Sequence, residues 1–216
     1  MDPGRILVTY ATNAGTTAEV AQAVAEELGR TGASVEVLRV EEVRSLEPYA
    51  AVVVGGPMII GWHRAAARFI RRNRRALGRV PVAYFFTAMS LTRTDHTSVD
   101  GTPVCIDPSL AKAPGRADRL SFRESYSTVV RYLRPVLRAA PEVRPVSAGF
   151  FGGRLDLFRL KWWQRLFVLI VIQERPGDRR NWPAIREWAA SLRAGRLCQM
   201  ETTCDPAHPE EGRADG

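Results

Sequence analysis

Two short stretches of the chain are apolar or aromatic at every position, and this restricts the fold more than any other feature of the sequence. They are residues 50–55 (AAVVVG) and residues 80–86 (VPVAYFF). A strand without charged or strongly polar positions is normally covered on both faces, as in a parallel sheet. The two stretches therefore predict an α/β fold whose central sheet is buried between layers of helices.

The remaining patterns alternate between strand and helix. Residues 6–10, 34–40 and 143–150 predict three more strands. Val20, Val24 and Leu28 recur every four residues, which is typical of a helix with one buried face. Further helices are predicted over residues 63–77, 121–139 and 183–192. Five strands that alternate with helices predict a doubly wound parallel sheet with helices on both faces.

The length of 216 residues allows one well-buried core. We expect a single domain over residues 1–195. The polar, Pro-rich segment 88–118 is too long for a simple turn and is predicted to be an irregular insertion. Residues 196–216 carry Pro, Gly and acidic groups and are predicted to form a disordered tail.

The net charge of +8 comes almost entirely from arginine, since Lys112 and Lys161 are the only lysines. This charge is compatible with nucleic acid, an anionic membrane or acidic substrates, or it reflects only an arginine-rich composition. The three cysteines include no CxxC pair, so neither a zinc site nor a disulfide framework is indicated. The sequence shows no signal-peptide pattern and no run of about 18 apolar residues, which leads us to expect a cytoplasmic protein.

The stretch TYATNAGTTAEVA, residues 9–21, joins a strand directly to a helix through small and hydroxylated residues. Free backbone N–H groups and the helix dipole favour an anion at such a junction. The loop lacks the lysine of GxxxxGK[ST], and GxGxxG is missing, which argues against ATP and dinucleotide sites. Hydroxyls and amides without a cationic side chain suit the phosphate monoester of FMN. The alternative is that these residues only cap the helix.

Three loops are expected at the carboxyl edge of the sheet, where ligands bind in such folds. They follow the first, third and fourth predicted strands, which are expected to be neighbours. The candidate cofactor-binding residues are Thr12, Asn13, Ala14, Gly15, Thr16 and Thr17 in the first loop; Pro57, Met58, Ile59, Ile60, Gly61 and Trp62 in the second; and Thr87, Ala88, Met89, Ser90 and Leu91 in the third.

The segment ILVTYATNAGTTAEVAQAVAEEL resembles the opening of a flavodoxin. The segments VVVGGPMIIGWHRAAARFI, GRLDLFRLKWWQRLFVLIVI and NWPAIREWA, in that order, are similar to the flavodoxin-type menaquinone-dependent protoporphyrinogen IX dehydrogenases. The resemblance implies a three-layer sandwich with a five-stranded parallel sheet in the order 2-1-3-4-5. It also implies that FMN is the cofactor, protoporphyrinogen IX the electron donor and a quinone the acceptor.

Carried over by position, the first loop would hold the FMN phosphate, and the second and third loops would flank the isoalloxazine ring. Two positions depart from the usual pattern. Ala11 replaces a common Ser, and Met58, Ile59 and Ile60 give the second loop no aromatic, so stacking on the ring would fall to Trp62 or be absent. No catalytic side chain is identified, which is expected where a flavin supplies the redox chemistry.

Two segments are candidates for contact with a membrane. Residues 154–173 combine basic residues with Phe158, Trp162 and Trp163, as an interfacial helix would, although the segment could also pack on the domain. The tract RFIRRNRR places Arg68, Arg71, Arg72 and Arg75 on one side of a helix, which could meet anionic lipid or nucleic acid or simply face solvent. No interleaved aromatics support nucleic-acid stacking.

Three functions remain open at this point. The first is an FMN-dependent oxidoreductase peripheral to the inner face of the cell membrane. The second is a flavodoxin-type electron-transfer protein without a small-molecule substrate. The third is a basic binding module that has lost the cofactor. Homo-oligomer formation is compatible with each of them.

Overall fold

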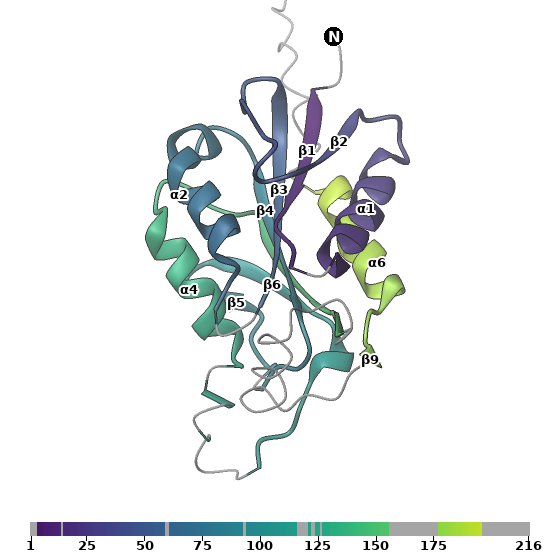
Figure 1. Ribbon diagram of the computed structural model, residues 1–216, viewed down its shortest axis with the longest axis vertical. Helices are drawn as coiled ribbons and strands as arrows, with labels where there is room; N and C mark the ends of the chain where they lie inside the picture. Colours follow the sequence, from purple (N-terminus) through teal and green to yellow (C-terminus); the bar gives the residue numbers. More distant parts are fainter. Residues whose placement is uncertain are drawn as a thin grey trace, which may run out of the picture.

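The computed structural model describes residues 4–195, apart from 14, 59–60, 93, 116–120, 122–123, 126 and 156–176. A central sheet separates two layers of helices (Figure 1). The helices α2 and α4 cover one face of the sheet, and α1 and α6 cover the other. This arrangement confirms the predicted α/β, flavodoxin-like class.

The sheet has seven strands in the order β2-β1-β3-β4-β7-β6-β5. All neighbouring strands are parallel except β5 and β6, which form an antiparallel pair. The strands are β1 (Arg5–Tyr10), β2 (Val35–Arg39), β3 (Tyr49–Pro57), β4 (Val82–Ala88), β5 (Ser98–Val99), β6 (Thr102–Ile106) and β7 (Ser147–Gly152).

The helices that cover the sheet are α1 (Thr16–Gly29), α2 (Arg64–Leu77), α4 (Val129–Ala139) and α6 (Trp182–Ala194), with a short 3-10 helix η1 (Pro108–Leu110). A separate two-stranded sheet pairs β8 (Arg154–Leu155) with β9 (Gly177–Asp178). In the described part of the chain, no helix combines the length and apolar character needed to cross a bilayer.

The prediction of five strands was wrong by two, because the segment 88–118 is not irregular throughout. Its strand β6 pairs in parallel with β7, and Val104 lies opposite Ala148. The strand β5 folds back on β6 through a turn in which Asp100 and Gly101 adopt positive φ. Pairing with a strand over 40 residues further along the chain leaves no periodic signal in the segment itself, which explains the error.

The predicted helix over residues 121–139 begins later than expected. The helix α4 starts after Thr128, whose hydroxyl accepts a hydrogen bond from the Arg131 backbone N–H at 3.3 Å. Of the predicted interfacial segment 154–173, residues 154–155 form strand β8, and the rest lies outside the described residues. The predicted tail, 196–216, also lies outside them.

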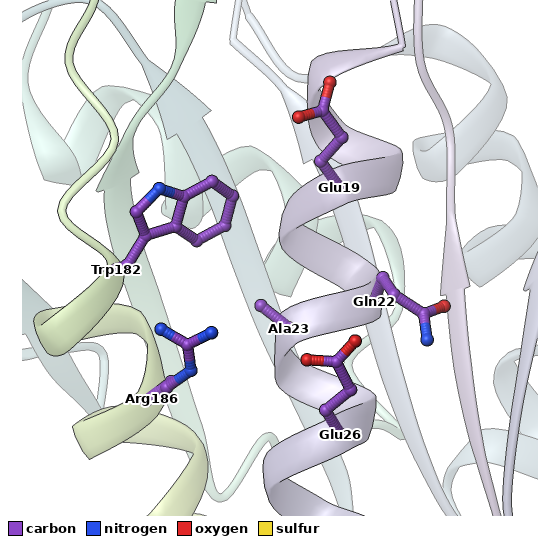
Figure 2. A pocket seen from close by; sticks show the side chains of 6 residues that line it. All are labelled: Glu19, Gln22, Ala23, Glu26, Trp182 and Arg186. Atoms are coloured by element: carbon purple, nitrogen blue, oxygen red, sulfur yellow. The ribbon is translucent and has the colours of Figure 1, made fainter.

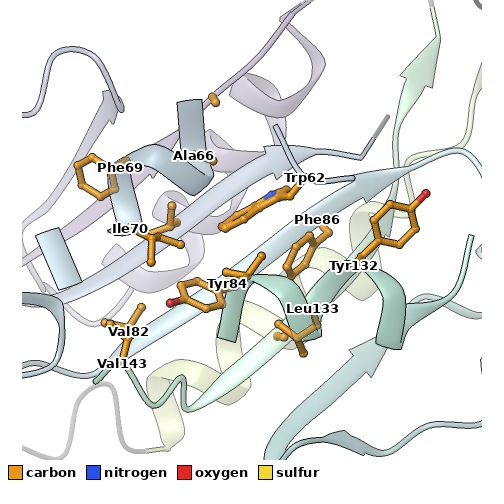
Figure 3. Packing of buried hydrophobic residues seen from close by; sticks show 14 of the residues in the cluster. Trp62, Ala66, Phe69, Ile70, Val82, Tyr84, Phe86, Tyr132, Leu133 and Val143 are labelled. Atoms are coloured by element: carbon orange, nitrogen blue, oxygen red, sulfur yellow. The ribbon is translucent and has the colours of Figure 1, made fainter. Parts of the chain in front are cut away.

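Aromatic side chains fill the core between the sheet and the layer of α2 and α4 (Figure 3). Phe86 of β4 stacks on Phe150 of β7, with ring centroids 4.5 Å apart and planes only 7° from parallel. Trp62 lies 4.8 Å from the Phe86 ring. On the opposite face, Trp188 of α6 packs edge-on against Phe151 and donates a hydrogen bond from Nε1 to Ser147 Oγ at 2.9 Å. The burial of these rings fixes the position of the strands whose ends form the site.

Candidate functional site: three loops at the carboxyl edge of the sheet

The three predicted loops lie together at the carboxyl edge of the sheet and are joined by hydrogen bonds. The backbone N–H of Ala11 donates to Gly55 O at 2.9 Å, and that of Met58 donates to Thr87 O at 2.9 Å. The hydroxyls of Thr17 and Thr87 lie 3.2 Å apart. The three loops are therefore neighbours, as the parallel-strand topology predicted.

The first loop leaves the amino terminus of α1 open. Gly15 is the N-cap residue, with a φ of 88°, and no side chain caps this helix. By contrast, α2, α4 and α6 are each capped by a side chain. The first N–H groups of a helix have no acceptor within the helix, so those of α1 are available to an anion. The interpretation of these loop residues as plain helix caps is therefore wrong.

Hydroxyl groups of this loop are arranged around the helix start. Thr12 Oγ1 accepts a hydrogen bond from the Gly15 N–H at 2.9 Å, which leaves its own proton free to donate. Thr16 donates from Oγ1 to the backbone oxygen of Arg154 at 3.0 Å. Gly15 permits the left-handed conformation that closes this turn. A phosphate monoester fits the donors that stay available here, the first N–H groups of α1 and the Thr12 hydroxyl, without a cationic side chain.

Ala11 has no exposed surface and belongs to the core between the sheet and α2. A side chain at this position faces the core rather than the outside of the loop. The absence of the usual Ser at this position therefore removes a hydroxyl from the interior and not from the open helix end. The presence of Ala11 instead of Ser therefore leaves the hydrogen-bond donors at the start of α1 unchanged.

His63 connects the second loop to the first. Its Nε2 lies 3.0 Å from Oδ1 of Asn13, and its Nδ1 accepts a hydrogen bond from the Ala65 N–H at 3.2 Å as the N-cap of α2. Because Nδ1 is an acceptor, the proton of the neutral ring is on Nε2, which donates to Asn13. Burial lowers the pKa of His63 and so favours this neutral form.

Two of the predicted site residues, Trp62 and Leu91, are buried in the core next to the loops. Trp62 is 9% exposed, contacts Tyr84 and Phe86, and donates from Nε1 to Gly56 O at 3.2 Å. Its ring packs among these core side chains, so stacking on the flavin would require the ring to leave the core. Leu91 is fully buried in the same core. Thr12, Asn13, Gly15, Thr16, Pro57, Gly61, Met89 and Ser90 retain exposed surface; Ala14, Ile59 and Ile60 lie outside the described residues.

The third loop is held by the segments that follow β7. Gly153 donates to Ala88 O at 2.7 Å, and Arg179 donates from Nη1 to Met89 O at 3.0 Å. Arg154, which also follows β7, contacts the first loop, because its backbone oxygen accepts the hydrogen bond from Thr16. Arg154 and Arg179 are both exposed at this edge. Sequence analysis did not place these residues in the site, because only tertiary contacts bring them there.

A buried carboxylate organises this region. Asp107 is 1% exposed; its Oδ1 accepts hydrogen bonds from Ser109 N at 2.9 Å and Asn181 Nδ2 at 3.0 Å, and its Oδ2 accepts from Gly152 N at 3.4 Å. Asn181 in turn caps α6. Asp107 thus joins the inserted strands, the end of β7 and the start of α6 beside the three loops.

A hollow of about 340 Å³ lies away from the three loops, between α1 and α6 (Figure 2). It is lined by Glu19, Gln22, Ala23, Glu26, Trp182 and Arg186. Next to it, Arg180 donates to Asp178 and Glu19 and lies 4.6 Å from the Trp182 ring. The hydrogen bonds from Arg180 hold the pKa of Asp178 below its usual range. With carboxylates on its walls, this hollow does not match a phosphate group.

The family model described as Flavodoxin domain matches residues 7–181, so the chain belongs to this family. FMN is the cofactor of this protein, and the residues present at the three loops fit FMN. The chain is therefore an FMN-binding protein of the electron-transfer type. The third hypothesis, a module without cofactor, is set aside by this assignment.

Comparison with curated proteins finds no match. Among solved structures, the chain is similar to the two-electron reduced flavodoxin of Megasphaera elsdenii, with 9% identity, 88% of this chain and 99% of that chain covered, and a TM-score of 0.49. A flavodoxin from the domain Archaea shows 10% identity over 88% of this chain and 96% of that chain, with a TM-score of 0.42.

Rubredoxin oxygen:oxidoreductase of Desulfovibrio gigas shows 17% identity over 40% of this chain, with a TM-score of 0.34. The alignment spans only 23% of that longer chain. The family membership rests on the family model, which covers most of the sequence.

Proposed function

We propose that this protein is an FMN-dependent oxidoreductase that oxidises protoporphyrinogen IX, or a related donor, with a quinone as electron acceptor. The choice of donor follows from the resemblance of three sequence segments to the menaquinone-dependent dehydrogenases. The observation that carries the proposal is the presence of exposed Arg154 and Arg179 beside the first and third loops. We place the protein in the cytoplasm, at the inner face of the cell membrane, where a lipid-soluble quinone is accessible.

The two arginines match the chemistry of such a donor. A porphyrinogen carries propionate groups, and the planar guanidinium of arginine binds carboxylates through two parallel hydrogen bonds. Arg179 is already oriented toward the third loop by its bond to Met89 O. A donor anchored at these arginines would present its ring to the three loops.

Each part of the chain has a distinct task in this proposal. The open start of α1, with Thr12 and Gly15, would hold the FMN phosphate, and the second and third loops would flank its ring. When bound, FMN would supply the redox chemistry that links the donor to the acceptor. Each two-electron oxidation of the porphyrinogen releases two protons, and the two electrons and two protons convert one quinone to a quinol. The protein's contribution is to hold these partners in place and to keep the loops rigid.

The first experiment is to saturate the purified full chain with FMN, remove the unbound cofactor and record the visible spectrum. The loaded protein is then mixed anaerobically with protoporphyrinogen IX and a soluble menaquinone analogue, and porphyrin fluorescence is followed. Porphyrin formation that requires both protein and quinone supports the proposal. Bound flavin without porphyrin formation would instead identify an electron-transfer protein without this substrate.

The role of the arginines beside the loops is tested separately. We expect Arg179→Gln to raise the KM for the porphyrinogen about ten-fold while the affinity for FMN stays unchanged, because a paired carboxylate is worth roughly 1.4 kcal/mol or more. Arg186→Gln, which removes an exposed arginine of α6 away from the loops, serves as the matched control. An equal KM for both variants would remove Arg179 from the donor site.

A further inference from the structure

We infer that the outer face of α2, together with α4, is a docking surface for an anionic lipid membrane. Residues 64–79 contain seven arginines and no acidic residue. All seven of these arginines are exposed. The inference extends the proposed location of the protein, and it depends on neither the donor nor the acceptor.

Among the helices that cover the sheet, the excess of positive charge lies on one face. Residues 64–79 and 129–144, which contain α2 and α4, carry eleven arginines and one acidic residue. Residues 16–30 and 182–195, which contain α1 and α6, carry three arginines and four glutamates. Because these two pairs of helices cover opposite faces of the sheet (Figure 1), the charge asymmetry becomes a spatial one. Such a molecule orients one face toward an anionic surface.

Within α2, four arginines form a straight stripe. Arg64, Arg68, Arg71 and Arg75 follow the spacing that places side chains on one side of a helix. Ala66, Phe69, Ile70 and Leu77 bury the opposite side. The stripe, named here the arginine stripe, therefore points directly away from the core and extends for about 16 Å at the helical rise per residue.

These like charges repel one another in the free protein. Arginines three and four positions apart are neighbours on the helix surface, and such pairs destabilise a helix. In the described part of the chain, the one ion pair found for an arginine of residues 64–79 is that of Arg74 with Glu142 at 3.1 Å. This pair lies beside the stripe and connects α2 to the segment after α4. An external array of anionic groups would relieve the repulsion along the stripe.

The shape and composition of the face favour lipid over nucleic acid. Lipid headgroups and nucleic acids both offer phosphate groups to guanidinium side chains. Single-stranded nucleic acid is bound through exposed aromatic rings, and the only aromatic of residues 64–79, Phe69, is buried. Clusters of basic residues on an amphipathic helix are typical of contact with anionic lipid. The face therefore fits the extended plane of phosphates that a membrane offers.

The test measures co-sedimentation of the full chain with vesicles of phosphatidylcholine alone or with about 30% phosphatidylglycerol, at about 0.1 M and about 0.5 M salt. We expect binding only to the anionic vesicles, with a loss at the higher salt. A stripe variant replaces Arg64, Arg68, Arg71 and Arg75 with Gln. A matched variant replaces Arg30, Arg39, Arg44 and Arg186 with Gln, which gives the same net charge.

The stripe variant should bind the anionic vesicles at least about ten-fold more weakly, since each basic residue near the surface contributes to attraction. The matched variant should stay within about three-fold of the unmodified protein. Equal losses in both variants, or full binding by the stripe variant, would overturn the inference. Tighter, stripe-dependent binding to duplex DNA or RNA in the same buffer would overturn it in favour of nucleic acid. The vesicle assay contains neither porphyrinogen nor quinone, so its failure is distinct from failure of the proposed function.

Discussion

The imidazole of His63 joins two loops of the candidate FMN site: its Nε2 lies 3.0 Å from Oδ1 of Asn13, while its Nδ1 caps α2. The bond from the Ala65 N–H to Nδ1 requires the neutral ring, because a second proton could only go to Nδ1 and would remove the acceptor of the cap. The bond from Nε2–H to Asn13 forms in both protonation states. Protonation of His63 therefore acts on the start of α2, which follows the second loop.

We predict a loss of stability in acid that depends on His63. Burial lowers the pKa of His63 below its ordinary value of 6.5, so the unfolded chain binds the proton more readily than the folded one. The contribution of His63 to stability is therefore complete above pH 6.5 and is lost as the pH falls below it. The measurement is the Tm of the protein from pH 8 to pH 5.

The matched variant for this prediction is His63→Asn, because Asn is a favourable N-cap residue and does not titrate. The decrease in Tm between pH 7 and pH 5.5 should be smaller in the variant than in the unmodified protein. Identical pH profiles would show that other groups account for the acid sensitivity.

Gly15→Ala should weaken FMN binding about ten-fold. A Cβ at a φ of 88° costs roughly 1–2 kcal/mol, and the free loop would relax away from the phosphate-binding shape to avoid it. Gly32→Ala is the control, since Gly32 has a φ of 91° in an open turn at the other end of α1. Fluorescence titration with FMN should separate the two: both variants lose stability, and only Gly15→Ala loses affinity.

Trp62→Phe should reduce stability and leave FMN affinity unchanged. The substitution removes the hydrogen bond to Gly56 O and part of a buried ring, for a loss of about 1–2 kcal/mol. Denaturant unfolding and FMN titration are the two measurements. If affinity instead fell ten-fold at unchanged stability, Trp62 would contact the flavin after all.

Asp107→Ala should lower the Tm by about 5–10 °C. The change removes the acceptor of three hydrogen bonds, one of them from the buried Gly152 N–H, at a total of about 2–3 kcal/mol, and each kcal/mol shifts the Tm of a domain of this size by about 2–4 °C. Asp95→Ala, at an exposed position of the same insertion, should change the Tm little. A similar decrease in both variants would mean that Asp107 has no special role in joining these segments.

Arg68→Glu should stabilise the protein by about 0.5–1 kcal/mol, because it converts repulsive pairs with Arg64, Arg71 and Arg72 into attractive ones. Arg44→Glu, at an exposed position close in sequence to Glu41, Glu42 and Glu47, should have the opposite sign. Thermal unfolding at low salt, where surface charges act most strongly, is the appropriate measurement. A lower Tm for Arg68→Glu would contradict the repulsion described for α2.

Much of the site could be predicted from local patterns. The apolar run 50–55 indicated a strand covered on both faces, and β3 is such a strand, with Ala51, Val52, Val53 and Val54 all buried. The change from strand to helix periodicity around Gly15 predicted the phosphate loop. Parallel topology then placed the second and third loops beside it. Each of these inferences uses residues that are close together in the sequence.

Other features depend on partners that are distant in the sequence. The segment 98–106 joins the sheet because β7 offers a free edge to β6. Trp62 turns inward because β4 and β7 supply Phe86 and Phe150 beneath it.

The sequence alone thus determined the class of fold, the order of its main elements and the chemical character of the phosphate loop, since period and composition are local properties. The tertiary structure decided which loop residues are exposed, which are buried as supports, and that Arg154, Arg179 and Asp107 belong to the site. The physical reason is that burial and long-range hydrogen bonds arise only when segments far apart in the chain pack against each other.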